Sequence, residues 1–362
     1  MAHPRVREQM AAFGVDVLVL CGENNVAYAT GRVARSQEPA RAGATRSVAI
    51  VTRDDHLVFQ PPSLDLDDGA RALAAAVADC SGVVAIDEYP SVVAYAALRE
   101  RAPIDAAPLL SQAKIVKTPD EVERIRAAQR LNENAIDIVR PLATPGARQT
   151  DLTAAFFRAI FEFGATGNTV DPIWNIVPPS IDGAGFTLTG HLPFPNPTTD
   201  RVLTTGDVMF NDMGIDLEGW ASDFGRTWII EREPDSRQRD QFERWCATCA
   251  ACERAIRPGS TAADVARAAT AANGGARPWF PHLYVAHGIG TESAELPFCG
   301  TDLGEEIEDQ VVLAQGTILV LEPVIWDDGH GGYRAEEIVV VTADGCERLT
   351  DYTYAPYEMS VR

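Results

Sequence analysis

Apolar positions in the first third of the chain alternate between a helical and an extended spacing. Helices are predicted over residues 4–13, 24–30, 66–80 and 91–101, and buried strands over 15–20 and 83–86. A hairpin is predicted over 46–60, because two apolar runs flank the turn residues Arg53, Asp54 and Asp55. Strands that alternate with helices predict a small α/β domain, and no glycine-rich phosphate loop interrupts it.

The pattern changes between Leu110 and Pro119, where a second domain is predicted to begin. Thr118 is a typical N-cap and Pro119 a typical first helical residue, and a long amphipathic pattern follows them. A further helix is predicted over 150–164. The non-helical segment 168–200 is longer than an ordinary connection, which makes it a candidate for shaping a pocket. We therefore expect two domains, residues 1–113 and 114–362.

Residues 206–227 predict two strands around a turn, with turn chemistry between Gly214 and Gly219. Asp212 ends the first strand and Asp223 lies on the second. A hairpin folds these two carboxylates towards each other. Two part-buried carboxylates repel, so they need a proton, a basic partner or a cation unless they only cap the turn.

Composition excludes several classes of partner. The formal net charge of −21 argues against nucleic acid and anionic membranes as partners. No apolar run reaches the roughly 20 residues that a membrane span needs, and the N-terminus does not read as a signal peptide. Seven scattered cysteines favour free thiols in a reducing cytoplasm. Cys246, Cys249 and Cys252 lie in a predicted helix, so they are interpreted as helix residues and not as an iron–sulfur site.

Three more polar residues stand on or beside strand-like apolar runs downstream of the hairpin. They are His287 in HGIG, Glu322 in VLEPV and Glu336 in YRAEEIVVVT. Together with the two aspartates they form an oxygen-rich set that suits a pair of divalent cations.

The order and local context of these residues resemble the pita-bread metallohydrolases, which include prolidase, aminopeptidase P, methionine aminopeptidase and creatinase. The matching elements are GD-x-x-x-x-D-x-G, S-D-x-x-R-T, H-G-x-G, E-P, R-x-E and V-T-x-x-G. The resemblance is strong over the C-terminal two-thirds of the chain. It implies an α/β (α+β) fold with a creatinase-like N-terminal α/β domain, then a pita-bread catalytic domain with a pseudo-twofold sheet and flanking helices. It also implies a homodimer.

The resemblance assigns roles to the five polar residues. Asp212 and Asp223 would bind the first metal, with Asp223 shared, and His287 the second. Glu322 would join the site and shuttle a proton, and Glu336 would bridge both ions. The donor set contains no thiolate, so manganese, zinc, cobalt or iron would each fit.

Arg334 and Glu336 are two residues apart on a predicted strand and should share a face. Arg334 would then lie beside the metals, where it could hold a carboxylate or a developing oxyanion. Glu337 should point the other way, which favours Glu336 as the ligand.

The substrate-binding positions depart from the peptidase pattern. Ala294 stands where the peptidases carry a second histidine, Trp326 where a tyrosine is expected, and Phe298 where some prolidases have an arginine. His191 and His282 are candidate replacements for the missing imidazole, although each could equally be structural.

The leading hypothesis is a dinuclear Xaa-Pro dipeptidase or aminopeptidase acting on a short peptide. An alternative is a pita-bread enzyme for a small non-peptide substrate, either an amidine or amide hydrolase or a lyase, because the second histidine and the tyrosine are replaced. A third is a binding module that has lost catalysis, which five retained buried polar residues disfavour.

Overall fold

The computed structural model describes residues 3–32, 47–59, 65–78, 80–89, 91–179 and 200–357. The chain divides into two compact units, residues 1–114 and 115–362. Each unit is described by itself.

The first unit is built on one five-stranded sheet with the strand order β3-β2-β1-β4-β5. Its strands are β1 (Val17–Leu20), β2 (Val48–Thr52), β3 (His56–Phe59), β4 (Val84–Ile86) and β5 (Ile104–Asp105). The pairs of β1 with β4 and of β4 with β5 are parallel, while β1 with β2 and β2 with β3 are antiparallel. The expected hairpin is therefore present, and its turn lies at residues 53–55.

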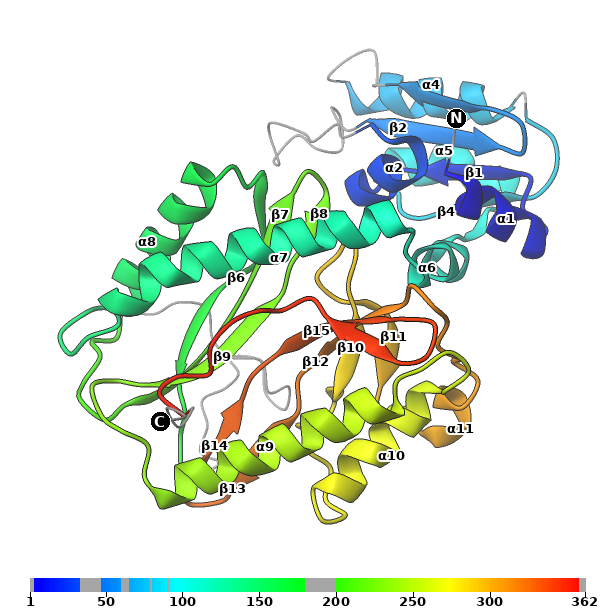
Figure 1. The fold of residues 1–362 in the computed structure, drawn as a ribbon. Helices are drawn as coiled ribbons and strands as arrows, with labels where there is room; N and C mark the ends of the chain where they lie inside the picture. Colours follow the sequence, from blue (N-terminus) through cyan, green and yellow to red (C-terminus); the bar gives the residue numbers. More distant parts are fainter. Residues whose placement is uncertain are drawn as a thin grey trace. The chain divides into compact units, whose positions relative to one another are not determined.

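Helices of the first unit cover this sheet (Figure 1). They are α1 (Pro4–Ala12), α2 (Glu23–Thr30), α4 (Leu66–Ala78), α5 (Val92–Leu98), the 3-10 turn η2 (Arg99–Arg101) and α6 (Ala107–Ile115). Alternate residues of the strands pack against the apolar faces of α4 and α5, and these residues form one buried core. The helical and extended periods of the sequence thus predicted most of these elements.

The second unit begins with two helices and carries two more near its middle. They are α7 (Pro119–Val139), α8 (Gln149–Glu162), α9 (Ser236–Ala255) and α10 (Ala262–Ala272), with the short η3 (Arg140–Leu142) and α11 (Glu305–Glu308). The start of α7 carries the predicted cap: Glu121 N–H donates to Thr118 Oγ1, and Thr118 N–H donates to the Glu121 carboxylate.

The strands of the second unit form two main sheets and a separate hairpin. One sheet contains β6 (Gly167–Ile176), β7 (Val208–Leu217), β8 (Trp220–Ala221) and β9 (Phe224–Ile229). The other contains, in spatial order, β11 (Glu295–Cys299), β10 (Ala286–Gly288), β12 (Ile318–Leu321), β15 (Glu337–Val341) and β16 (Cys346–Arg348). The hairpin joins β13 (Val324–Asp327) to β14 (Gly331–Arg334).

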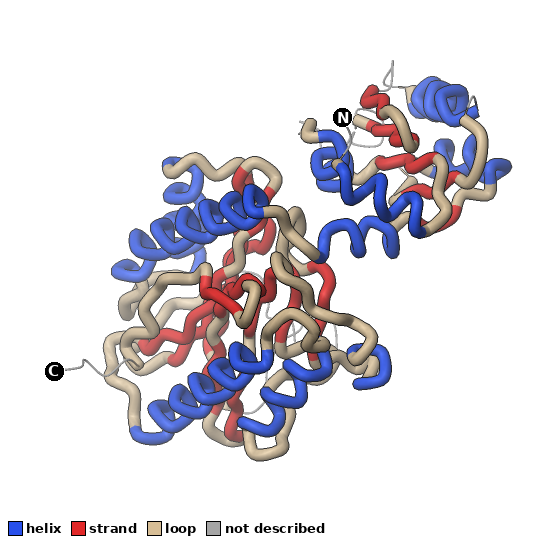
Figure 2. The backbone as a smooth tube through the Cα atoms, turned by 45° about the vertical axis from the view of Figure 1, so that its right-hand side comes forward, coloured by secondary structure: helices blue, strands red, loops and turns tan. Residues whose placement is uncertain are grey.

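Two pairs of helices flank these strands, as Figures 1 and 2 show. The helices α7 and α8 share a buried core with β6, β7 and β9. The helices α9 and α10 share another with β10, β12 and β15. Polar residues that point between the two layers of helices are therefore shielded from solvent on both sides.

The segment 168–200 contains more regular structure than the sequence pattern indicated. Its first part is the long strand β6, which pairs with β7 through two irregularities of register. Residues 180–199 lie outside the described part of the chain. The predicted pocket-shaping role therefore concerns β6, from which side chains do reach a pocket described below.

All seven cysteines are free thiols. Cys249 and Cys252 are buried on one side of α9, and burial raises the pKa of the Cys252 thiol to about 12. These cysteines are packing residues of a helix, as the sequence indicated. No helix within the described ranges is both long and apolar enough to cross a membrane.

A buried ion pair joins the two sheets of the second unit. Arg226 on β9 donates from Nη2 to Glu337 Oε1 of β15 at 3.0 Å, and both side chains are at most 2% exposed. Its Nη1 also donates to the carbonyl oxygen of Glu336 at 2.6 Å. The guanidinium therefore fixes the backbone at the start of β15.

Replacing Arg226 with leucine should destabilise the protein by about 3–5 kcal/mol, because the buried Glu337 carboxylate would lose its buried cation and keep only Arg348, 3.7 Å away. Chemical denaturation measures this change. The double variant Arg226→Leu/Glu337→Leu should recover part of the loss. The exposed pair of Arg158 and Glu162 provides a matched control, and Arg158→Leu should change stability little. Equal effects of the two arginine substitutions would contradict the argument.

Candidate active site

Strand pairing brings the two aspartates of the hairpin together. Asp212 lies on β7 directly opposite Gly225 of β9, and Asp223 occupies the break between β8 and β9. The turn is later than expected: β7 continues through Gly214 to Leu217, and Glu218 and Gly219 turn the chain with positive φ angles of 53° and 91°. The predicted turn at 214–219 is therefore corrected to its last two residues.

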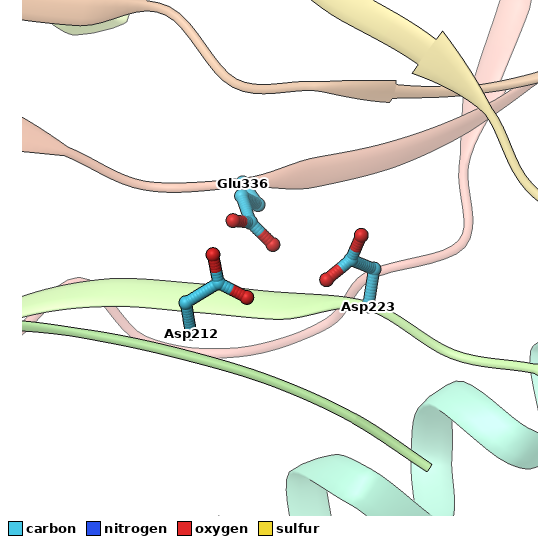
Figure 3. Close-up of side chains that lie close together, drawn as sticks. All are labelled: Asp212, Asp223 and Glu336. Atoms are coloured by element: carbon cyan, nitrogen blue, oxygen red, sulfur yellow. The ribbon is translucent and has the colours of Figure 1, made fainter. Parts of the chain in front are cut away.

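Glu336 joins these aspartates from another part of the chain (Figure 3). One oxygen from each of Asp212, Asp223 and Glu336 can be chosen so that the three lie within 4.8 Å of one another. Glu336 N–H donates to the carbonyl oxygen of Gly225 at 3.0 Å, which docks the start of β15 onto β9. A Cβ atom on Gly225 would stand 2.6 Å from the Glu336 carboxylate, so glycine is required for this approach.

His287 and Glu322 extend the group of carboxylates on its other side. His287 Nε2 lies 3.4 Å from Asp223 Oδ2 and 3.5 Å from Glu322 Oε1. Its Nδ1 is 2.9 Å from the carbonyl oxygen of Gly288, which can only accept, so Nδ1 carries a proton. In the neutral imidazole the lone pair of Nε2 therefore faces the two carboxylates, as a metal ligand requires.

Arg334 is the cation that the structure places among these acids. Its guanidinium contacts Glu322, Glu336 and Asp212, with Nη2 2.7 Å from Glu336 Oε1 and Nη1 3.0 Å from Asp212 Oδ2. Arg334 and Glu336 do not share the one regular strand that the sequence predicts, because β14 ends at Arg334 and β15 begins at Glu337. Arg334 and Glu336 nevertheless meet across this break, while Glu337 turns to Arg226.

Burial and like charge make these carboxylates hard to ionise together. Burial raises the pKa of Asp223 well above its ordinary value, and the carboxylates of Asp212 and Glu322 raise it further. Burial does the same to the pKa of Glu336, followed by the charges of Asp223 and Asp212. Burial would lower the pKa of Arg334, but the surrounding carboxylates hold that pKa well above its usual value. The cluster of carboxylates around Arg334 therefore lacks the positive charge that would allow all of its members to be ionised together.

A cavity of about 330 Å³ opens beside these residues. The acids Asp212, Asp223 and Glu322 lie on its wall together with His287 and Arg334. The remaining wall is mainly apolar, and its larger side chains are Val170, Ile173, Phe210, Phe280, Leu283 and Tyr284. Ser293 and Ala294 complete it. The cavity thus has one highly polar side and one apolar side.

The other residues singled out in the sequence have different places. His282 is not part of the cavity wall; its side chain is 56% exposed and its Nδ1 lies 2.6 Å from Asp302 Oδ2. His191 lies outside the described residues. Ala294 is on the wall, so the position of the missing second histidine does face the cavity. Phe298 packs against Tyr284, with ring centroids 5.0 Å apart.

Several wall residues gave no signal in the sequence. Val170 and Ile173 belong to a segment expected to be irregular, and Phe280, Leu283 and Tyr284 precede β10 in a loop without a recognisable motif. Strand alternation could not have indicated both Val170 and Ile173, because they are three residues apart and an irregularity of register lies between them.

Comparisons with known proteins agree on the architecture. The prolidase of Thermococcus sibiricus superposes with a TM-score of 0.78 over 97% of each chain at 19% identity. The Xaa-Pro dipeptidase of Bacillus anthracis gives a TM-score of 0.77 over 96% of each chain at 20% identity. The chain therefore has the pita-bread fold, preceded by a creatinase-like domain, that the resemblance implied.

Sequence comparison identifies the family. The model of metallopeptidase family M24 matches residues 123–343, and the chain belongs to that family. A probable dipeptidase PepE of Mycobacterium bovis is 31% identical over 264 residues, which are 72% of this chain and 64% of that protein. The Xaa-Pro dipeptidase of Pyrococcus furiosus is 27% identical over 247 residues, 67% and 65% of the two chains. The chain thus spans just under two-thirds of these relatives' length.

Gly225→Ala tests the close approach of the two sheets. The added Cβ should push the Glu336 carboxylate away from Asp212 and Asp223, and so lower the affinity for added divalent cations at least about tenfold. Isothermal titration with Mn²⁺ measures this. Gly345→Ala is the matched control, because no atom lies within 4 Å of its added Cβ. Unchanged Mn²⁺ affinity in Gly225→Ala would show that Glu336 is not a ligand.

Proposed function

We propose that the chain is a dinuclear, metal-dependent hydrolase of amide bonds, of the Xaa-Pro dipeptidase or aminopeptidase type. The observation that carries the proposal is the convergence of Asp212, Asp223 and Glu336 beside a cavity whose wall includes both aspartates, His287 and Glu322. Membership of a metallopeptidase family supports it, as do relatives named as dipeptidases.

The residues present fit a metal centre. Asp223 Oδ1 and Glu336 Oε2 are buried and have no hydrogen-bond partner in the part of the chain that the structure describes. Buried carboxylate oxygens without partners are costly, and a divalent cation is the partner that this donor set accepts best. Divalent cations bound there would activate water for attack on a carbonyl carbon.

Charge favours two cations over one. Four carboxylates, those of Asp212, Asp223, Glu322 and Glu336, face the single guanidinium of Arg334. One divalent cation would leave the group negative. Two would leave it positive by one charge, which a hydroxide balances. Oxygen and imidazole donors without thiolate suit manganese, zinc, cobalt or iron, so availability would select among them.

The chain's own residues divide the remaining work. Asp212, Asp223, His287 and Glu336 would hold the cations, with Glu336 as the bridge. Glu322 lies on the cavity wall. It would bind a cation and would also carry a proton to the leaving nitrogen. Arg334 holds the carboxylates of Asp212, Glu322 and Glu336 in one arrangement. His282, which pairs with Asp302, is not assigned a role in the reaction.

A second candidate function keeps the metals and changes the substrate. The apolar wall and Ala294 favour an enzyme specialised for a small non-peptide amide. The homodimer and the cytoplasmic location stay predictions from the sequence.

Asp223→Asn should abolish binding of both cations and reduce hydrolysis of an Xaa-Pro substrate at least about a thousandfold, because a shared ligand is lost. The metal-free variant should be more stable than metal-free wild type, because one buried charge is gone. Elemental analysis, steady-state kinetics and thermal unfolding measure these effects. The exposed Asp328→Asn is the control. A fully active Asp223→Asn protein in chelator would refute the proposal.

A further inference from the structure

The cavity is poorly suited to a substrate with a free carboxylate. Arg334 is the one Lys or Arg side chain on its described wall, and it already contacts Asp212, Glu322 and Glu336. Residues 180–199 contain neither lysine nor arginine in their sequence. With the two proposed cations and their hydroxide in place, the charges of the polar side cancel, so a negatively charged group that enters would find no unused cation on the described wall.

A free dipeptide cannot keep its carboxylate away from this environment. The carboxylate carbon of an Xaa-Pro dipeptide is two bonds from the nitrogen of the bond to be cut, so it must enter with that bond. A buried carboxylate without a cation is strongly disfavoured. An amide or ester at the same place carries no charge, and its apolar part can contact Phe210, Phe280 and Leu283.

We propose that the preferred substrate is a largely apolar amide in which no carboxylate lies next to the bond that is cut. The inference rests on the proposed hydrolase activity and specifies its substrate. Leu283, Phe280 and Phe210 are the residues that set this preference. A C-terminally blocked dipeptide or a longer peptide belongs to this class, and a free dipeptide does not.

Two compounds that contain the same Leu-Pro bond, with and without a free carboxylate beside it, test this substrate preference. With Mn²⁺-loaded protein, kcat/KM for leucyl-prolinamide should exceed that for leucyl-proline by about tenfold or more. Leu283→Arg, which adds a cation to the wall, should shift the ratio towards the free dipeptide, whereas Leu283→Gln should not. Equal or faster cleavage of leucyl-proline by wild type would overturn the substrate assignment alone. Cleavage of neither compound would overturn the proposed hydrolase itself.

A separate observation concerns Tyr284. Tyr284 lies on the cavity wall. Its ring lies edge-on to the ring of His287, with the centroids 5.1 Å apart. Within the described part of the chain its hydroxyl has no hydrogen-bond partner. A phenol ordinarily keeps its proton near neutral pH, so this hydroxyl can donate a hydrogen bond.

We infer that the Tyr284 hydroxyl donates a hydrogen bond to the carbonyl oxygen of the substrate amide. The tyrosine stands on the same wall as Ala294, where the second histidine of the peptidases is absent. A carbonyl oxygen gains negative charge while water adds to its carbon, so this hydrogen bond strengthens in the transition state. No proton needs to leave the phenol.

Tyr284→Phe isolates the hydroxyl, because phenylalanine preserves the ring contacts with His287 and Phe298. We expect kcat to fall about 10²-fold, with KM, bound Mn²⁺ and melting temperature unchanged. Tyr95→Phe, in the first unit and half exposed, is the control. A kcat within twofold of wild type would overturn the role of the hydroxyl. Loss of Mn²⁺ together with activity would overturn it too, since it would show a structural effect.

Discussion

The repulsion among buried carboxylates is the constraint on which the site depends. Asp212, Asp223, Glu322 and Glu336 cannot all be ionised in a shielded place unless positive charge lies among them. Arg334 supplies one such charge by contacting three of the four. Because one guanidinium does not balance four carboxylates, the arrangement calls for bound cations. The proposed chemistry of the protein follows from this deficit of positive charge.

The scaffold around the acids consists of contacts between the two sheets of the second unit. Glu336 is positioned by its backbone, which donates to Gly225 and accepts from Arg226. Gly225 leaves room for the Glu336 side chain. Arg226 is itself held by the neighbouring Glu337. Adjacent glutamates thus have different surroundings, since Glu336 lies with Asp212, Asp223 and Arg334 and Glu337 is part of the structural ion pair.

The cavity combines a group of acids with a largely apolar wall. The proposed ligand positions lie within the residues that the M24 family matches, and the chain superposes on a prolidase over nearly its whole length. On the wall, however, Ala294 and Tyr284 line the cavity together with His287, and Arg334 is the one Lys or Arg side chain among the described wall residues. In the proposed reaction, different residues would carry metal binding and substrate selection, so one could change while the other is kept.

The sequence alone determined the family, the fold and the composition of the acidic group, because each polar residue stands inside a short motif at the end of an apolar run. It also separated Glu336 from Glu337 by strand parity, although the chain in fact breaks between β14 and β15. Only the tertiary structure decided which other residues face the cavity. His282 turned to Asp302, while Leu283 and Tyr284 lie on the wall. A loop has no fixed period, so the direction of its side chains depends on packing between segments distant in the chain.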